Sequence, residues 1–592
     1  MTTRALSDRG AVVLALAAAA GALVHRPTSL PAAIGTVGLA FVVRRPALLC
    51  VGAALLASAM GARCWAGLQP PSPHRVQGIA TLVSDPEHVL DALHLEVRLH
   101  GTRLDAWARG DAAAALEPRL AGERIEVEGR VKPVAPGQRD RLAVRHISGQ
   151  LSIARVGAWS RGNVAETMAN GVRRTLERGV ASLPGQQRAL FMGFVLGDSR
   201  GQSDATANDF RNAGLTHLLV VSGENVAFIL ALAGPLLRLL QLRTRFVAGL
   251  LLLLAFGVLV RWEPSVLRAE AMAALALFAT TLGRPVSGLR LLALAVTGLV
   301  IVDPVLVRSV GFLLSVGACA GIALWATPLA ARIPGPRIVG EPLAVTIAAQ
   351  LGVAPVLIPV FGGLPVAAIP ANLLAIPAAG PLTMWGMTAG AVAGLAGGAA
   401  AAALHAPTRV LITWIAAVAH ACAHLPLGHI GLVPLAVGGL CAVAWRRGPR
   451  AVRPYLVPVG ALGLLVIPLA LASLTATNDV TAQPVTSAAH LWRRGSATVV
   501  VLDRPPSAGF PAALRRAHVT HVDVLALASA DSRMGHALDD LIPAVNPGLI
   551  VSPPGFHRPH LAVATPGTEV AVGGLVVRAD GESPVRFSVV SR

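Results

Sequence analysis

This chain of 592 residues contains little cysteine and almost no lysine. The 5 cysteines form no C-x-x-C pair and no metal-ligand spacing, so neither a disulfide framework nor a metal cofactor is indicated. Lys132 is the only lysine, and the resulting bias toward arginine says little about function. No Walker A motif occurs, so we expect the motive force for any transport to come from another protein.

Acidic residues are also scarce. Asp and Glu number 31 against 50 Lys and Arg, which gives a formal net charge of +19. Cytoplasmic loops that obey the positive-inside rule explain this excess, and this is the simpler interpretation for any single arginine. Attraction to a polyanion is the alternative, and the composition leaves both open.

Apolar sequence is abundant, at 54% hydrophobic residues. Several runs approach the roughly 20 residues that a helix needs to span a bilayer, so we predict a polytopic α-helical membrane protein. The first run, over residues 11–24, could imitate a signal peptide. Further apolar runs over 31–43 and 46–60 follow almost at once, so we expect an anchor instead.

Composition changes along the chain predict the domains. Residues 70–157 alternate apolar and polar positions, which predicts short strands and favours an OB-like β-barrel. Arg44 and Arg45 should face the cytoplasm and thereby place this barrel outside. The tail predicts strands at 497–503 and 521–527 with a helix at 511–517 between them, a β-α-β pattern. We therefore expect N-terminal transmembrane helices in 1–68, an extracytoplasmic OB-like domain in 70–157, amphipathic or linking helices in 162–212, a transmembrane block in 213–474 and an α/β tail in 490–592.

One stretch of the transmembrane block is unusually polar. His217, Ser222, Glu224 and Asn225 lie within three helical turns of one another, in sequence that is otherwise apolar. Polar groups in hydrocarbon cost several kcal/mol unless they are paired, so these side chains are either solvated in a cavity or used. Gly223, among them, allows a close backbone approach or a break in the helix. The pattern indicates a channel, a transporter or an intramembrane enzyme.

This stretch resembles a motif of the ComEC/Rec2 family of competence membrane proteins. Many members read H-L-L-x-x-S-G-x-H-V, and here Asn225 stands where the second histidine is usual. Other matching pieces follow in the family's order: Leu196-Gly197-Asp198, Ser265-Val-Leu-Arg268-Ala with Met272, Asp303-Pro304, Gly311-Phe-Leu-Leu-Ser315, Gln350 and Pro370-Ala-Asn372-Leu. Each piece is weak by itself, but their common order is specific.

The resemblance implies a channel that carries single-stranded DNA across the plasma membrane during natural transformation. Its partners would be single-stranded DNA, the lipid membrane, an outer-face DNA receptor and a cytoplasmic helicase-type ATPase, with the oligomeric state open. The channel residues would be His217, Ser222, Gly223, Glu224, Asn225, Arg268, Gln350 and Asn372. Candidate DNA-binding residues outside the block are Trp107, Arg173 and Arg174, although one tryptophan gives the barrel little base-stacking surface.

The tail departs from the family pattern. Metallo-β-lactamase folds bind two metal ions through an H-x-H-x-D-H cluster. The matching stretch here, Leu527-Ala-Ser-Ala-Asp531-Ser-Arg-Met-Gly535-His536, keeps one aspartate and lacks the clustered histidines. We therefore expect a truncated, degenerate metallo-β-lactamase-like tail with no metal and no nuclease activity, and we assign no catalytic residue.

Each polar residue also has a simpler interpretation. If the stretch is one continuous helix, residues 217, 221 and 224 share one face and 218, 222 and 225 the next, and Ser222 would only join neighbouring helices. Arg268 could extend to the membrane surface instead of contacting phosphate. The alternative function is a membrane-embedded hydrolase or transferase of a cell-envelope substrate, with His217 and Glu224 as acid and base. A degenerate paralogue without a transport role is a third possibility.

Overall fold

The computed structural model describes residues 7–425, 429–430 and 483–591, with gaps at 90–91, 135–137, 284–285 and 362 and further short gaps in the last segment. It contains two compact units. The first comprises Met1–Gln202, Leu215–Val356 and Ile369–Val418, and the second Ser203–Gly214, Leu357–Ala368 and Ala419–Arg592. Two apolar runs at the end of the expected transmembrane block, 428–445 and 455–474, are predicted to be helices from their sequence and lie outside the described residues, apart from 429–430.

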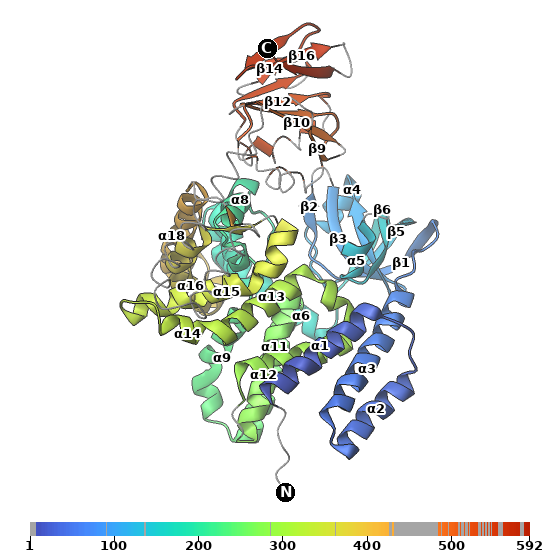
Figure 1. Ribbon diagram of the computed structural model, residues 1–592, viewed down its shortest axis with the longest axis vertical. Coiled ribbons are helices and arrows are strands. Elements are labelled where there is room, and N and C mark those ends of the chain that lie inside the picture. Colours follow the sequence, from blue (N-terminus) through green and yellow to red (C-terminus); the bar gives the residue numbers. More distant parts are fainter. Residues whose placement is uncertain are drawn as a thin grey trace, which may run out of the picture. The chain divides into compact units, whose positions relative to one another are not determined.

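Three apolar helices begin the chain, as the sequence predicts: α1 (Asp8–Val24), α2 (Leu30–Val43) and α3 (Pro46–Gly67). Ser7 caps α1 by accepting a hydrogen bond from the Gly10 amide at 3.1 Å. Helix α1 packs against α3 and against α12 (Gly288–Val302), and the three N-terminal helices are blue in Figure 1. Gly21 makes this packing close, because a Cβ there would overlap the backbone of Ala54.

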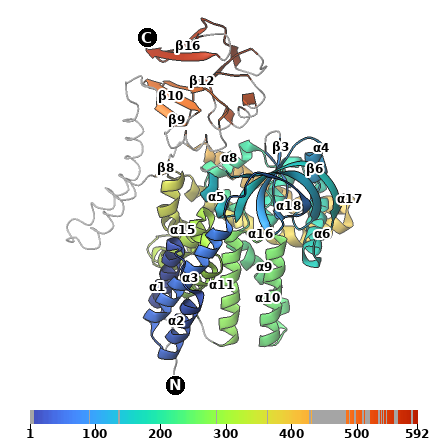
Figure 2. The same ribbon diagram turned by 90° about the vertical axis from the view of Figure 1, so that its right-hand side faces the viewer.

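A β-barrel follows the third helix, and Figure 2 shows it. Neighbouring strands pair in the closed order β1–β3–β4–β6–β5–β1, and only β4 and β6 are parallel. The inward residues alternate along β5, so that Ile125, Val127, Gly129 and Val131 are buried while the side chains of residues 126, 128 and 130 face water. The strands are β1 (His74–Leu82), β2 (Glu87–Val89), β3 (Ala92–Leu99), β4 (Thr102–Ala108), β5 (Arg124–Pro133) and β6 (Ile147–Ser160), with α4 (Asp111–Leu116) between β4 and β5.

The rest of the first unit is mainly helical. Five helices of the described chain are long and apolar enough to cross a membrane, which makes this a multi-pass membrane protein: Pro46–Gly67, Leu242–Leu259, Val310–Ala330, Arg337–Phe361 and Ala406–Ala423. The helices from the barrel onward are α6 (Val164–Gly179), α7 (Gly185–Leu196), α8 (Asp204–Asn212), α9 (Gly223–Arg238), α10 (Leu242–Leu259), α11 (Pro264–Thr281), α12, α13 (Val310–Gly321), η5 (Ile322–Ala326), α14 (Thr327–Ala330), α15 (Arg337–Phe361), α16 (Ala368–Ala396), α17 (Gly398–Leu404) and α18 (Ala406–Ala423).

Glycines let two of these helices approach closely. Gly317 and Gly321 are spaced four residues apart on α13, and both face Gly352 of α15. A Cβ on any of the three would overlap the backbone of the opposite helix. Small residues at this spacing are a common way for membrane helices to pack, because close backbones gain van der Waals contact that lipid does not supply.

The tail forms its own sheets. Strands β11 (Ala497–Leu502) and β12 (Val524–Leu527) are parallel, which confirms the two strands expected there, whereas most of the helix expected at 511–517 lies outside the described residues. The main sheet has the order β14-β13-β12-β11-β10-β9, and a three-stranded antiparallel sheet follows. The remaining strands are β9 (Gln483–Thr486), β10 (Ala489–Arg494), β13 (Leu549–Ser552), β14 (Leu561–Val563), β15 (Glu569–Val572), β16 (Leu575–Asp580) and β17 (Arg586–Ser591).

A buried arginine joins the barrel to the helices. Arg173 of α6 is 1% exposed, and its Nη2 donates to Asp85 Oδ2 at 2.9 Å and to Asp198 Oδ2 at 3.2 Å. Its Nη1 donates to the Leu259 carbonyl at 3.0 Å. Asp85 belongs to the barrel, Asp198 follows α7 and Leu259 ends α10, so one side chain connects four elements.

Two further guanidinium groups belong to the same network of ion pairs. Arg261 Nη2 donates to Asp85 Oδ1 at 2.9 Å, and Arg200 pairs with Asp198. Burial by itself raises the pKa of Asp85, but Arg173 and Arg261 outweigh burial and hold that pKa at about 2. A carboxyl with a lowered pKa stabilises the fold at neutral pH, and this contribution is lost as the pH falls from about 4 to about 2.

A second polar contact joins the barrel to the membrane helices. His146, just before β6, has its Nε2 3.0 Å from Asp303 Oδ2 and its Nδ1 3.6 Å from Cys64 Sγ. Asp303 is held in turn by the Val305 amide, which donates to its Oδ1 at 3.2 Å. The hydrogen bonds to Asp303 and Cys64 raise the pKa of His146 to about 10, although partial burial opposes this.

We expect Arg173→Gln to destabilise the chain far more than the adjacent Arg174→Gln. Without Arg173, the carboxylates of Asp85 and Asp198 lose one of their positively charged partners. Breaking a buried ion pair costs about 3–5 kcal/mol. Arg174 is 46% exposed and pairs with a single carboxylate, Glu123, which is itself buried, so a smaller cost of about 1–3 kcal/mol is expected. Thermal unfolding of the detergent-purified full chain measures both. Equal melting temperatures for the two variants would contradict the central place of Arg173.

A raised histidine pKa predicts a pH dependence of the opposite sign to that of Asp85. The stabilisation from His146 is full below its unfolded pKa of about 6.5 and is lost as the pH rises through about 10. The melting temperature of the wild type should therefore fall more between pH 6.5 and pH 10 than that of His146→Gln. The exposed His88 is the matched control, and His88→Gln should follow the wild type. Parallel curves for wild type and His146→Gln would contradict this assignment.

Candidate functional site

The polar motif forms a break between helices. Residues Thr216–Leu218 make one 3-10 turn, Ser222 is extended, and α9 begins at Gly223. Ser222 caps α9 by accepting a hydrogen bond from the Glu224 amide at 3.2 Å. The interpretation of the motif stretch as one continuous helix is therefore wrong, because the capping serine ends the helical hydrogen-bond pattern before Gly223. His217 and Glu224 are both exposed at this break.

Two other motif segments hold the break in place. Ser265 Oγ, near the start of α11, donates to the Val221 carbonyl at 2.8 Å. Asn225 is buried, and its Nδ2 donates to the Phe194 carbonyl of α7 at 3.3 Å. Gly197, with φ of 69°, ends α7, and a Cβ there would press against Val221. Ser222 and Ser265 thus each satisfy one backbone group of the break, while Asn225 joins the start of α9 to α7.

Arg268 lies beneath the break with neutral partners. It is 5% exposed, and its Nε donates to Ser315 Oγ at 2.8 Å. Its Nη1 lies 3.3 Å from Met272 Sδ and 3.1 Å from Cys319 Sγ. Within the described residues, no carboxylate comes within 4.0 Å of this guanidinium to form an ion pair. The hydroxyl and sulfur partners carry no formal negative charge. The positive charge of Arg268 is therefore not neutralised by an ion pair with any described residue.

Gly223 connects the break to this charge. A Cβ at position 223 would lie 2.9 Å from Arg268 Nη2 and 3.0 Å from the Cβ of Ala269. A larger residue at position 223 would therefore crowd Ala269 and displace the guanidinium, so glycine is what allows this close approach. The close approach aims Nη2 at the backbone of the break, so the motif glycine and the motif arginine belong to one site.

Sequence reasoning missed Cys319 and gave no partner to Arg268. Ser315 and Cys319 are four residues apart on α13, and Arg268 and Met272 are four residues apart on α11. Residues at this spacing share a helix face, so two helices that present these faces to each other enclose the guanidinium. Helical spacing was the available signal, although it does not say which helices are neighbours.

Gln350 and Asn372 lie on other helices of the block. Gln350 is half-buried on α15, and its Oε1 is a buried oxygen without a hydrogen bond to the described residues. Asn372 is 5% exposed on α16. Helix α15 packs closely on α13 through Gly352, two residues from Gln350, so Gln350 is near the helix that holds Ser315. Their roles in a channel stay predictions.

The three DNA-binding candidates are in different surroundings. Trp107 is half-buried on β4, donates its Nε1–H to Asp105 Oδ2 at 2.8 Å and packs its ring 4.7 Å from that of His94. Arg173 is buried in the ion-pair network. Arg174, one residue later, is half-exposed and pairs with Glu123. Of the three, Arg174 is the most accessible to a polyanion, and the DNA-binding roles stay predictions.

The barrel also presents a basic pair that sequence reasoning missed. Arg75 on β1 and Arg130 on β5 are directly opposite in the strand register, and both are exposed. Like charges directly opposite each other destabilise a sheet unless an anion lies between them. Lys132, two residues after Arg130, faces the same side. Strand alternation predicts each exposed position, but only the register brings the arginines together.

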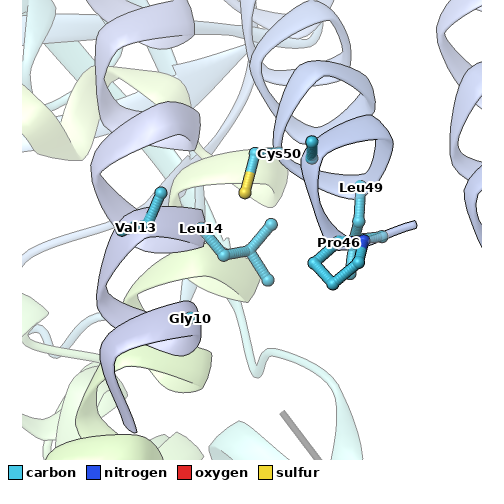
Figure 3. A pocket seen from close by; sticks show the side chains of 7 residues that line it. Gly10, Val13, Leu14, Pro46, Leu49 and Cys50 are labelled. Carbon is cyan, nitrogen blue, oxygen red and sulfur yellow. The ribbon is translucent and has the colours of Figure 1, made fainter. Parts of the chain in front are cut away.

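A small pocket of about 190 Å³ lies elsewhere in the same unit, between α1 and α3 (Figure 3). Figure 3 shows apolar side chains of both helices and the sulfur of Cys50 around it. This lining offers a phosphate no hydrogen-bond donor, so the pocket is not part of the candidate site. The lining residues are Gly10, Val13, Leu14, Pro46, Ala47, Leu49 and Cys50.

Comparison with known proteins gives one match. Residues 194–446 match the family model described as Competence protein. No curated protein and no solved structure matches the chain. The matched range begins within α7 and contains the helix break, Arg268, Gln350 and Asn372. It follows the barrel and ends before the tail.

Proposed function

Residues 194–446 of this chain match the family model described as Competence protein, and from this match we propose that the protein conducts single-stranded DNA across the plasma membrane during natural transformation. The observation that carries the proposal is the site around Arg268. Four segments meet there: the end of α7, the break before α9, the start of α11 and the face of α13. Family membership implies a role in DNA uptake, and this site is where we place the passing strand.

The helix break supports a transport role. An unwound segment between apolar helices presents backbone groups and polar side chains where a regular helix would present only apolar surface. His217 and Glu224 are exposed at this break, with Val220 also exposed between them. A phosphate backbone passing there meets polar atoms in place of hydrocarbon.

The charge of Arg268 supports recognition without sequence preference. Its guanidinium is buried among neutral atoms, so its field reaches the break with little local compensation. Transport must ignore base sequence, and phosphate is the part of DNA that does not vary. We propose that Arg268 attracts phosphates through its field, while Ser315 only holds the guanidinium in place.

The barrel would collect the strand first. Its five closed strands, with one parallel pair and a helix between β4 and β5, support an OB-like domain, a class that often binds single strands in a basic groove. Arg75 and Arg130 supply opposed positive charges on its surface. The outer-face receptor and the helicase-type ATPase belong to the proposal by family analogy alone.

We expect Arg268→Gln to reduce uptake of labelled DNA and transformation by about tenfold or more, because it removes an attractive charge. Arg268→Lys keeps the charge and should retain more activity. Ser315→Ala is the matched control: it removes the 2.8 Å hydrogen bond, keeps the charge and should stay within about threefold of wild type. The measurement is complementation of a deletion strain, with membrane levels equalised by immunoblot. Wild-type uptake in Arg268→Gln would contradict the proposed role.

We expect the double variant Arg75→Ala/Arg130→Ala to weaken binding of the detergent-purified full chain to fluorescent single-stranded DNA. Loss of two phosphate contacts should also lower the slope of log affinity against log salt by about 1.4, at about 0.7 per contact. Arg155 is the control, since it is 81% exposed but pairs with Glu128 at 3.4 Å. If Arg155→Ala and the double variant give the same salt slope, the basic pair is not the DNA contact.

A further inference from the structure

A pair of histidines stands at the end of α18, within the second unit. His420 and His424 are four residues apart and both exposed, and their ring centroids are 4.3 Å apart. Asp209 of α8 approaches the pair, with its Oδ2 2.8 Å from His420 Nδ1. One ligand atom from each of these three side chains lies within 4.8 Å of the others.

The hydrogen bonds fix the same nitrogen in both rings. His420 Nδ1–H donates to the Asp209 carboxylate, and His424 Nδ1–H donates to the His420 carbonyl at 2.7 Å. Each ring then carries its proton on Nδ1, which leaves Nε2 with a free lone pair. Within the described part of the chain, neither Nε2 has a hydrogen-bond partner. Metal-binding histidines are oriented in this way, with the second nitrogen donating to a carboxylate or a backbone carbonyl.

We infer that this cluster is a binding site for a divalent transition-metal ion, with Zn²⁺ as the best-matched probe. Two histidines at this helical spacing present their nitrogens on one face, and imidazole suits zinc, copper and nickel. His420 Nε2 and His424 Nε2 are the direct ligands. Asp209 orients His420 and adds a negative charge to two neutral rings. Water fills the remaining coordination positions, as the exposure of both rings allows.

The distances suit such an ion after small rotations. Zinc–nitrogen bonds of about 2.0–2.1 Å place tetrahedral ligands about 3.3 Å apart. The three side chains each place one possible ligand atom within 4.8 Å of the others, and turning the two rings brings their Nε2 atoms toward the separation that zinc needs. His420 is 68% exposed, so its ring has room to turn without disturbing the core.

A bound ion would tie α8 to the end of α18. It would reinforce the 2.8 Å hydrogen bond that already joins His420 to the half-buried Asp209. Helix α8 ends at Asn212, five residues before His217 in the sequence. The site is therefore placed to stabilise the segment that leads into the helix break, independently of whether DNA passes there.

The test measures zinc bound to the full chain in detergent, without DNA. Wild type, His420→Ala, His424→Gln and Asp209→Ala are dialysed against the same chelator-buffered Zn²⁺, and bound zinc per chain is determined by mass spectrometry. The chain has 17 histidines, so comparison with a matched control is essential. His88→Ala serves, because His88 pairs with Glu117 at 3.1 Å on an exposed surface but has no second histidine four residues away.

Wild type and His88→Ala should hold one more zinc than His420→Ala and His424→Gln, and Asp209→Ala should bind that zinc about 10–100-fold more weakly. Zinc should also raise the melting temperature of the wild type but not of the two histidine variants, whose melting temperatures without zinc should match the wild type. Equal zinc content in wild type and both histidine variants would overturn the inference. Because no DNA is involved, that result would leave the proposed transport function untouched.

Discussion

The fold depends on how it keeps charge among apolar helices. Arg173 is a buried charge whose partners offset the cost of removing it from water. Its guanidinium contacts two carboxylates and a carbonyl, and so connects the barrel, α6, the turn after α7 and the end of α10. Buried charges need partners of this kind, since removing them from water costs several kcal/mol per ion. Because four elements share this side chain, the barrel and the helices of the first unit have a common anchor.

Arg268 shows the other solution. It is almost as buried, but its partners are a hydroxyl and two sulfur atoms, so its charge is held in place and left uncompensated. A protein that only needed stability would gain by a carboxylate there or by an apolar residue. Gly223 allows the helix break to approach the Arg268 guanidinium closely. Ser265, at the start of α11, donates a hydrogen bond to the Val221 carbonyl within the break. Motif residues far apart in the sequence therefore build one positively charged, irregular site in a helical block, which is what the proposed passage of phosphates would need.

Much of the fold was predictable from the sequence because periodicity reports burial. Apolar runs predicted the helices, alternation predicted the strands of the barrel, and the β-α-β pattern predicted the parallel strands β11 and β12. The helix break was not predictable, since His217, Ser222 and Glu224 also fit a continuous helix. The two hydrogen bonds that mark the break, from the Glu224 amide to Ser222 and from Ser265 to the Val221 carbonyl, are visible only in the folded chain. Arg173 and Arg174 looked alike as neighbours on a polar helix, and only tertiary packing separates the buried residue from the half-exposed one. Pairings such as Arg75 with Arg130 need the strand register, and composition does not contain it.

The most direct test is to ask whether imported DNA touches the helix break. A photo-crosslinking amino acid at Val220, which is 43% exposed in the break, would be compared with one at Val42, which is 80% exposed on α2. During uptake of labelled DNA in living cells, the account predicts crosslinks from position 220 and none above background from position 42. Crosslinks from neither position, or equally from both, while uptake proceeds normally, would contradict the claim that the strand passes the break.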